Sequence, residues 1–117
     1  MKLLPQRPLT EIDIINFSKG ISNFRGVFMR NQLPTAPYKW ESGIVNLDDC
    51  NGPGTHWVAY RKKGNQVEYF DSFGDLRPPL ELQEYFGCNS KISYNYDRYQ
   101  NYGTYNCGHL CLKFLYK

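Results

Sequence analysis

Three side chains that could act together in nucleophilic catalysis stand at the ends of strongly patterned segments. His56 opens a segment rich in β-forming residues, Asp71 directly follows a second such segment, and Cys107 begins an apolar segment with helical spacing. An imidazole oriented by a carboxylate can take the proton of a thiol, and the positive end of a helix lowers the pKa of a cysteine placed there. Each residue alone has an ordinary explanation, as a structural histidine, a turn aspartate or a core cysteine, so the prediction depends on their combination.

A predicted β-hairpin would place the histidine beside the aspartate. Residues 56–60 and 66–70 favour strands, and the short glycine-containing sequence between them favours a turn. In such a hairpin the start of one strand lies next to the end of the other. We therefore expect the His56 ring within hydrogen-bond reach of the Asp71 carboxylate, and about 3–4 Å from the sulfur of Cys107.

The pattern as a whole predicts an α+β fold, with a central antiparallel or mixed sheet of about four to five strands packed against the helix that carries the cysteine. Strand 43–47 should join the two hairpin strands in an antiparallel meander. A first helix should begin at a Thr10 cap with Asp13 and end near Gly20, and Ile12, Ile15 and Phe17 suit it. A loop with a short strand is expected in 21–33, a helix over 80–86 and a strand at 91–96. The last helix should begin at or just before Cys107, with apolar residues at 107, 110, 111, 114 and 115.

Length and composition fit a single small domain. The chain has 117 residues and a net charge of +3, which suggests one domain over 1–117 with an extended N-terminal arm at 1–8. The basic residues are scattered, so the charge does not require a nucleic-acid partner. The four cysteines and two histidines lack zinc-site spacing, so we expect neither a metal nor another cofactor. The polar start and the lack of a long apolar run predict an intracellular protein with reduced thiols, neither secreted nor partnered with a membrane.

Three sequence motifs resemble those of the adenovirus protease (adenain) family, which groups with the ubiquitin-like-protein-specific cysteine proteases. The motifs are Gly-x-His-Trp at 54–57, an acidic residue before a Ser-Phe-Gly turn at 71–74, and a glutamine seven residues ahead of a Cys-Gly helix start at 100–108. They occur in the family's order, and the similarity covers roughly residues 20–117. This order argues against the papain arrangement, in which the cysteine comes first.

The resemblance implies a cysteine endopeptidase and assigns roles to its residues. Gln100 would donate its side-chain amide to the oxyanion, with the backbone N–H of Cys107 as the second donor. Trp57 would pack near the imidazole and shield it from water. The catalytic residues implied in this way are His56, Asp71, Gln100 and Cys107. The residues that we expect to bind the substrate are Trp57, Asn106 and Gly108.

The family also suggests substrates and leaves two alternatives open. A polypeptide substrate, from a viral or mobile-element precursor protein, would be cleaved near small residues such as glycine, in the cytoplasm or nucleus of a host cell or in a virion. The first alternative is a protease that removes ubiquitin-like modifiers, because that branch uses aspartate at the place of Asp71 whereas adenain often has glutamate. The second, of another class, is a catalytically inactive peptide-binding module.

A further expectation concerns activation. The resemblance implies an activating peptide that bonds to a cysteine upstream of the catalytic glutamine, and activation by DNA. Cys88 lies twelve residues before Gln100, close to that place. The alternative is that Cys88 is a small structural residue in a loop beside Gly87.

Overall fold

A hairpin-connected meander forms the centre of the sheet in the computed structural model, which describes residues 6–7, 9–47, 56–72, 74, 77–94 and 107–116. Strand β3 (Trp57–Lys63) pairs antiparallel with β2 (Trp40–Asn46) on one side and with β4 (Gln66–Phe70) on the other. Gly64 lies in the turn between β3 and β4 with a φ of +63°, a conformation that glycine adopts without strain. The predicted meander is confirmed.

The two outer strands run parallel to their neighbours, which makes the sheet mixed. β1 (Phe24–Met29) pairs with β2 and β5 (Lys91–Tyr94) pairs with β4, so the five strands follow their order in the chain. Parallel neighbours need a crossover connection, and helix α2 (Leu80–Phe86) lies in the crossover between β4 and β5. The predicted α+β class with about five strands is confirmed, while the expected extension of the last strand to residues 95 and 96 lies outside the described residues.

The first two strands are longer than their sequence pattern indicated. β2 begins at Trp40 rather than at Gly43, because Glu41 and Ser42 pair with residues at the end of β3. β1 is a six-residue strand where a loop with a short strand was expected. Polar residues concealed the start of β2, since strand formation depends more on cross-strand partners and burial than on local propensity.

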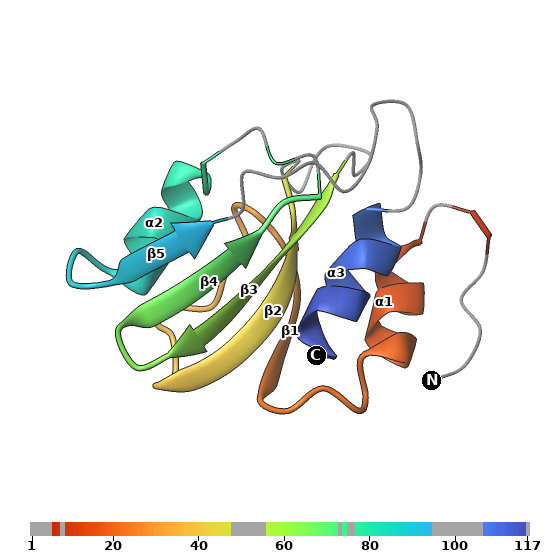
Figure 1. Cartoon of the computed structure of the whole chain (residues 1–117), viewed down its shortest axis with the longest axis horizontal. Helices are drawn as coiled ribbons and strands as arrows, with labels where there is room; N and C mark the ends of the chain where they lie inside the picture. The colour runs from red at the N-terminus through yellow and green to blue at the C-terminus, as the bar shows by residue number, and fades with distance from the viewer. Residues whose placement is uncertain are drawn as a thin grey trace.

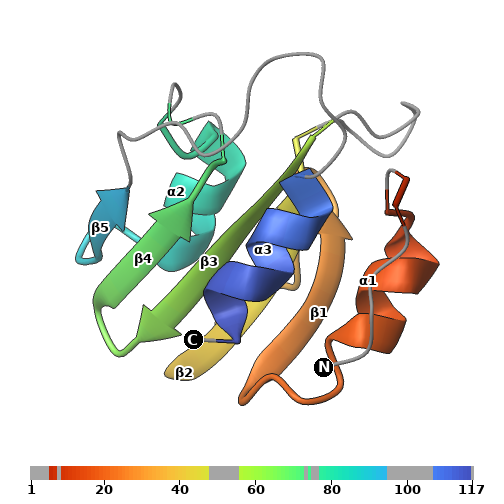
Figure 2. The ribbon, with the colours of Figure 1, turned by 45° about the vertical axis from the view of Figure 1, so that its right-hand side comes forward.

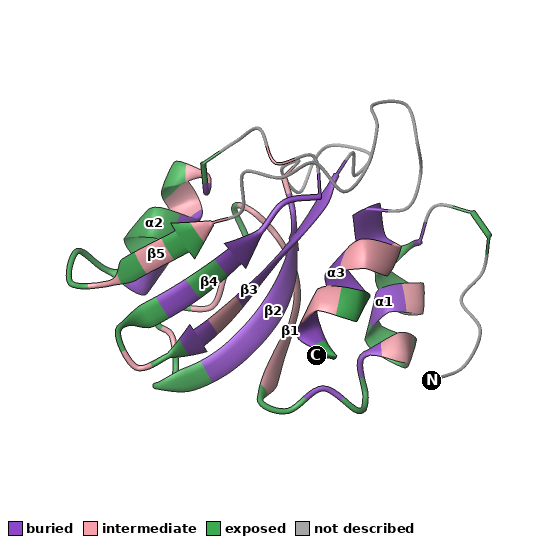
Figure 3. Ribbon diagram, viewed as in Figure 1, coloured by how far each residue is buried: buried purple, intermediate pink, exposed green. Residues whose placement is uncertain are grey.

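Helices cover the two faces of the sheet unequally (Figures 1 and 2). α1 (Glu11–Phe17) and α3 (Cys107–Leu115) lie on one face, and α2 lies on the other. Each face has its own apolar core, and the central strands β2 and β3 are buried almost throughout (Figure 3). Within the described residues, no helix is long and apolar enough to cross a bilayer.

Helix α1 begins as predicted, and Ile14 is its buried residue. The side chain of Thr10 accepts a hydrogen bond from the Asp13 N–H, and the Asp13 carboxylate accepts one from the Thr10 N–H, which together make a capping box. Ile14 is fully buried, whereas Ile12 is 71% exposed and Ile15 is also exposed. The expected short helix is confirmed, and because it has only two turns it presents a narrow face to the sheet, which Ile14 occupies.

Helix α3 begins at Cys107 as predicted, but its buried face is rotated. The buried residues are Cys107, Gly108, Cys111, Leu112 and Leu115. The row at 107, 111 and 115 was expected, whereas Leu110 and Phe114 are only partly buried at the side of the core. The helix contacts α1 as well as β3, and Gly108 in its first turn lies against Leu9 and Trp57.

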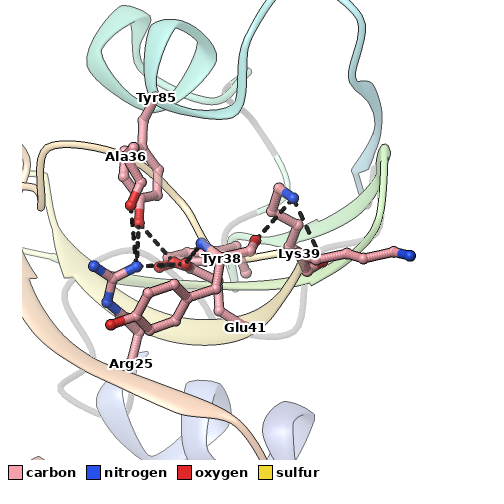
Figure 4. Close-up of polar contacts among 8 residues, drawn as sticks. Arg25, Ala36, Tyr38, Lys39, Glu41 and Tyr85 are labelled. Atoms are coloured by element: carbon pink, nitrogen blue, oxygen red, sulfur yellow. Dashed lines mark hydrogen bonds and ion pairs between the residues drawn. The ribbon is translucent and has the colours of Figure 1, made fainter.

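A buried carboxylate on the opposite face ties α2 and the segment before β2 to the sheet (Figure 4). Glu41 Oε1 accepts hydrogen bonds from Arg25 Nη1 at 2.9 Å and from the Tyr38 N–H at 2.6 Å. Its Oε2 accepts hydrogen bonds from the hydroxyls of Tyr60 at 2.5 Å and Tyr85 at 2.8 Å. The Glu41 side chain is fully buried, and these four donors replace the water that it loses.

Gly43 permits this arrangement because the Tyr60 ring crosses β2 at that point. A β-carbon on Gly43 would lie 2.7 Å from the Tyr60 ring, closer than van der Waals contact allows. Burial and the hydrogen bond to Glu41 both raise the pKa of Tyr60, so its hydroxyl stays a donor over the ordinary pH range.

Replacing Glu41 should destabilise the fold strongly. Glu41→Gln removes the counter-charge of the mostly buried Arg25 and turns an amide N–H₂ toward groups that are themselves donors. We expect a loss of about 3 kcal/mol in the free energy of unfolding, measured by urea denaturation.

The matched control is Glu81→Gln, which breaks a more exposed ion pair with Arg30 in which the two side chains are each 36% exposed at an N–O distance of 3.4 Å. A pair of this kind contributes at most about 1 kcal/mol. Equal losses in the two variants would contradict a structural role for the buried carboxylate.

Candidate active site

The pairing of β2 with β3 holds His56 in place. His56 directly precedes β3, and its carbonyl accepts a hydrogen bond from the N–H of Leu47 at 2.9 Å, which continues the ladder beyond the pair of Asn46 and Trp57. The residue is 8% exposed. The backbone of His56 is therefore fixed by the sheet, although regular strand structure begins one residue later.

The pairing of β3 with β4 brings Asp71 to the same place. Phe70, the last residue of β4, pairs with Ala59, so Asp71 leaves β4 beside the start of β3, where His56 lies. His56 Nε2 and Asp71 Oδ1 lie 2.7 Å apart, and Asp71 is 1% exposed. The contact expected from the hairpin is thus present.

Cys107 reaches the imidazole from a separate element. It is the first residue of α3, it is 9% exposed, and its interaction with His56 lowers the pKa of its thiol. One turn later, the Cys111 thiol donates a hydrogen bond to the carbonyl of Trp57 at 3.3 Å, which ties the helix to the start of β3. The three side chains singled out from the sequence therefore come together, with the carboxylate hydrogen bonded to the imidazole and the imidazole lowering the pKa of the thiol.

Opposing effects set the protonation of this chain. Burial by itself lowers the pKa of His56, but hydrogen bonds to Asp71 and Cys107 outweigh it and raise this pKa to about 9. Burial likewise raises the pKa of the Cys107 thiol, but the hydrogen bond with His56 and backbone hydrogen bonds from Trp57 and Gly108 give a net lowering. Both shifts favour an imidazolium beside a thiolate, which is the reactive form of cysteine.

The other residues predicted for the site divide into two groups. Trp57 and Gly108 are both buried at the start of β3 and α3, in contact with Leu9. Gln100 and Asn106 lie outside the described residues, so their roles stay predictions. Contact of Trp57 and Gly108 with a substrate also stays a prediction.

Sequence reasoning missed Leu9 as part of this neighbourhood. Leu9 is 4% exposed and belongs to the same core cluster as Trp57 and Cys107. A signal was available, since Leu9 directly precedes the Thr10 cap and Ile14 is the fourth residue of the helix. An apolar pair at these two positions is the pattern of a hydrophobic staple.

The remaining thiols and acids do not form a metal centre where the chain is described. In these parts of the chain there is no group of three or more His, Cys, Asp or Glu side chains that could hold a metal ion. Cys88, Cys107 and Cys111 are free thiols, and of these only Cys88 is exposed. Burial raises the pKa of Cys111 well above its usual value, which leaves it neutral and unreactive beside Cys107.

Comparison with known proteins shows what the fold is similar to. No family model and no curated protein sequence matches the chain. Among solved structures, it matches the ASFV pS273R protease with a TM-score of 0.60 and 16% sequence identity over 96% of this chain. This chain has the fold of a viral protease. The resemblance to adenain-like cysteine proteases, expected from the three motifs, is confirmed at the level of the fold.

The match also shows a difference in size. The chain spans 57% of the length of the ASFV protease, and an identity of 16% relates the two proteins by fold alone. The site residues of this chain therefore rest on its own geometry.

The pKa of His56 provides a direct test of the hydrogen-bonded chain. We expect its imidazole to titrate at about pH 9 in an NMR titration, with His109→Gln used to assign the signals. Because this pKa lies above the ordinary 6.5, protonated His56 adds stability that is complete below pH 6.5 and is lost as the pH rises through about 9. Asp71→Asn and Cys107→Ala should each move the midpoint back toward 6.5, and a wild-type midpoint near 6.5 would contradict the arrangement.

Proposed function

We propose that this chain is a cysteine endopeptidase in which Cys107 is the nucleophile, His56 is the general base and acid, and Asp71 orients the imidazole. The observation that carries the proposal is a thiol at a helix N-terminus whose pKa is lowered by an imidazole, and this imidazole lies 2.7 Å from a buried carboxylate. Nucleophile, base and orienting acid in this order are the recurrent arrangement of covalent acyl-transfer catalysis.

The geometry supports a stepwise reaction. The Cys107 thiolate attacks the carbonyl carbon of the scissile peptide bond, and a tetrahedral oxyanion forms. Protonated His56 then gives its proton to the leaving amine, and a thioester remains on the sulfur. Water, deprotonated by His56, hydrolyses the thioester and returns the thiol. Asp71 keeps His56 in one orientation through both halves and stabilises its positive charge.

The oxyanion needs donors that are in place before the reaction. In this proposal the backbone N–H of Cys107, at the positive end of α3, is one donor and the side-chain amide of Gln100 is the other. The assignment of Gln100 comes from the sequence resemblance alone.

The proposed substrates are polypeptides. The motif resemblance and the shared fold support a precursor protein of a virus or mobile element, cleaved near small residues such as glycine, as the natural substrate. The three free thiols agree with action in a reducing compartment, so we place the activity inside a host cell or in a virion.

A pair of covalent probes separates this function from its alternatives. A peptide ending in glycine vinyl sulfone should label Cys107 and leave Cys111 unlabelled, as read by mass spectrometry of the digested protein. Preferential labelling by a ubiquitin-like protein with the same warhead would instead favour a protease that removes such modifiers. Binding of the peptide without labelling would favour the inactive peptide-binding module.

Substitutions should separate the roles of the site residues. Cys107→Ala should abolish peptide cleavage, and His56→Ala should nearly do so. Asp71→Asn should leave partial activity, because the carboxylate mainly orients the ring. Gln100→Ala should lower kcat by about 10²–10³ with the fold retained, as circular dichroism would verify. Undiminished cleavage by Cys107→Ala would refute the mechanism.

Activation through Cys88 is a separate proposal about the same enzyme. Cys88 is an exposed thiol between α2 and β5, so a peptide thiol could reach it. If a peptide or DNA activates the protein, the rate of probe labelling should rise on addition of that partner, and Cys88→Ser should remove the response to a thiol peptide. Equal rates under all conditions would leave Cys88 a structural residue.

A further inference from the structure

The segment that precedes α1 covers the start of α3, next to the nucleophile. Leu9 is 4% exposed, and its carbonyl accepts a hydrogen bond from the indole Nε1 of Trp57 at 3.1 Å. In both ribbon views this segment leads into α1 at the same end of the molecule as the first turn of α3 (Figures 1 and 2). A residue far from Cys107 in sequence therefore forms part of its surroundings.

The Leu9 side chain also contacts the first turn of α3 through Gly108. A β-carbon at Gly108 would lie 3.2 Å from Leu9 Cβ and 3.4 Å from Trp57 Cδ1, which is tighter than ordinary carbon contacts. Glycine thus allows Leu9, Trp57 and the helix to meet without a gap. The two residues that Leu9 contacts adjoin the thiol: Gly108 follows Cys107 in α3, Trp57 shares a core cluster with Leu9 and Cys107, and the backbone of both lowers the pKa of Cys107.

Interactions on either side of Leu9 hold the segment in place. Arg7 donates hydrogen bonds to both carboxylate oxygens of Asp13, at 2.6 and 3.2 Å, and Asp13 forms the capping box with Thr10. Leu9 lies between Arg7 and Thr10, so its backbone has little freedom to move away from the start of α1. Arg7 and Thr10 are thus both fastened to Asp13 in α1, and Leu9 lies against Gly108 and Trp57.

We propose that Leu9 is a positioning residue of the active site, one that holds Trp57 and the first turn of α3 so that the Cys107 thiol stays beside His56. The inference rests on the proposed function, because the positioned group is the proposed nucleophile. In this proposal Leu9 forms the side of the site on which it contacts Trp57 and Gly108.

The test compares two buried leucines of the same core cluster at opposite ends of α3. Leu9→Ala and Leu115→Ala each remove a side chain that is at most 6% exposed. Both should lower the urea midpoint by a similar amount. The informative readout is the pH profile of Cys107 alkylation by iodoacetamide, resolved by mass spectrometry, with exposed Cys88 as the reference for reagent reactivity.

We expect Leu9→Ala to raise the pH midpoint of Cys107 alkylation by about one unit, which slows the reaction about tenfold below the midpoint. Leu115→Ala should leave the midpoint unchanged, and Leu9→Met, which keeps the volume, should restore the wild-type value. The titratable groups that interact with the Cys107 thiol in the described chain are His56 and Cys111, Asp71 acts on His56, and none of these is altered in the variants.

The outcomes distinguish the inference from the function on which it rests. An unchanged pH midpoint of Cys107 alkylation in Leu9→Ala, or an equal rise in Leu115→Ala, overturns the positioning role. The proposed function is kept if the wild-type midpoint lies below that of an ordinary thiol and rises in His56→Ala. A wild-type midpoint like that of an ordinary thiol, unmoved by His56→Ala, overturns both. If Leu9→Ala does not fold, Leu9→Val replaces it. We then expect a smaller rise in the pH midpoint of Cys107 alkylation, and an unchanged midpoint would overturn the positioning role.

Discussion

The packing of α3 against β3 is the contact on which the candidate site depends. Cys107, Cys111 and Leu115 form one row along the helix, and this row lies in the apolar core of the sheet. The same packing that buries Leu115 at one end therefore sets the thiol of Cys107 against His56 at the other. The hydrogen bond from Cys111 to the carbonyl of Trp57 fixes how far the helix can slide along the strand.

Burial makes the three hydrogen-bonded groups depend on one another. Desolvation alone would neutralise both the imidazole and the thiol, since it lowers the pKa of His56 and raises that of Cys107. Their hydrogen bonds reverse both effects, because charges and dipoles interact more strongly where water is excluded. The loss of Asp71, His56 or Cys107 would leave the other two buried without a full set of partners.

Two buried carboxylates at opposite ends of the sheet serve different purposes, and the difference lies in their partners. Glu41 is held by Arg25, by two tyrosine hydroxyls and by a backbone N–H, and these donors keep their protons over the ordinary pH range. Asp71 is held by His56, which can exchange a proton. The first cluster is therefore a structural anchor, and the second is suited to proton transfer.

The sequence by itself determined the central meander, the start of α3 at Cys107 and the closeness of His56 to Asp71, because alternation, turn chemistry and helical spacing are local and hairpin register follows from them. Tertiary structure decided the parallel pairing of β1 and β5, the buried faces of α1 and α3, and the contact of Leu9 with Trp57 and Gly108. These features depend on which surfaces meet, and residues far apart in the chain carry no local pattern that reports their contact.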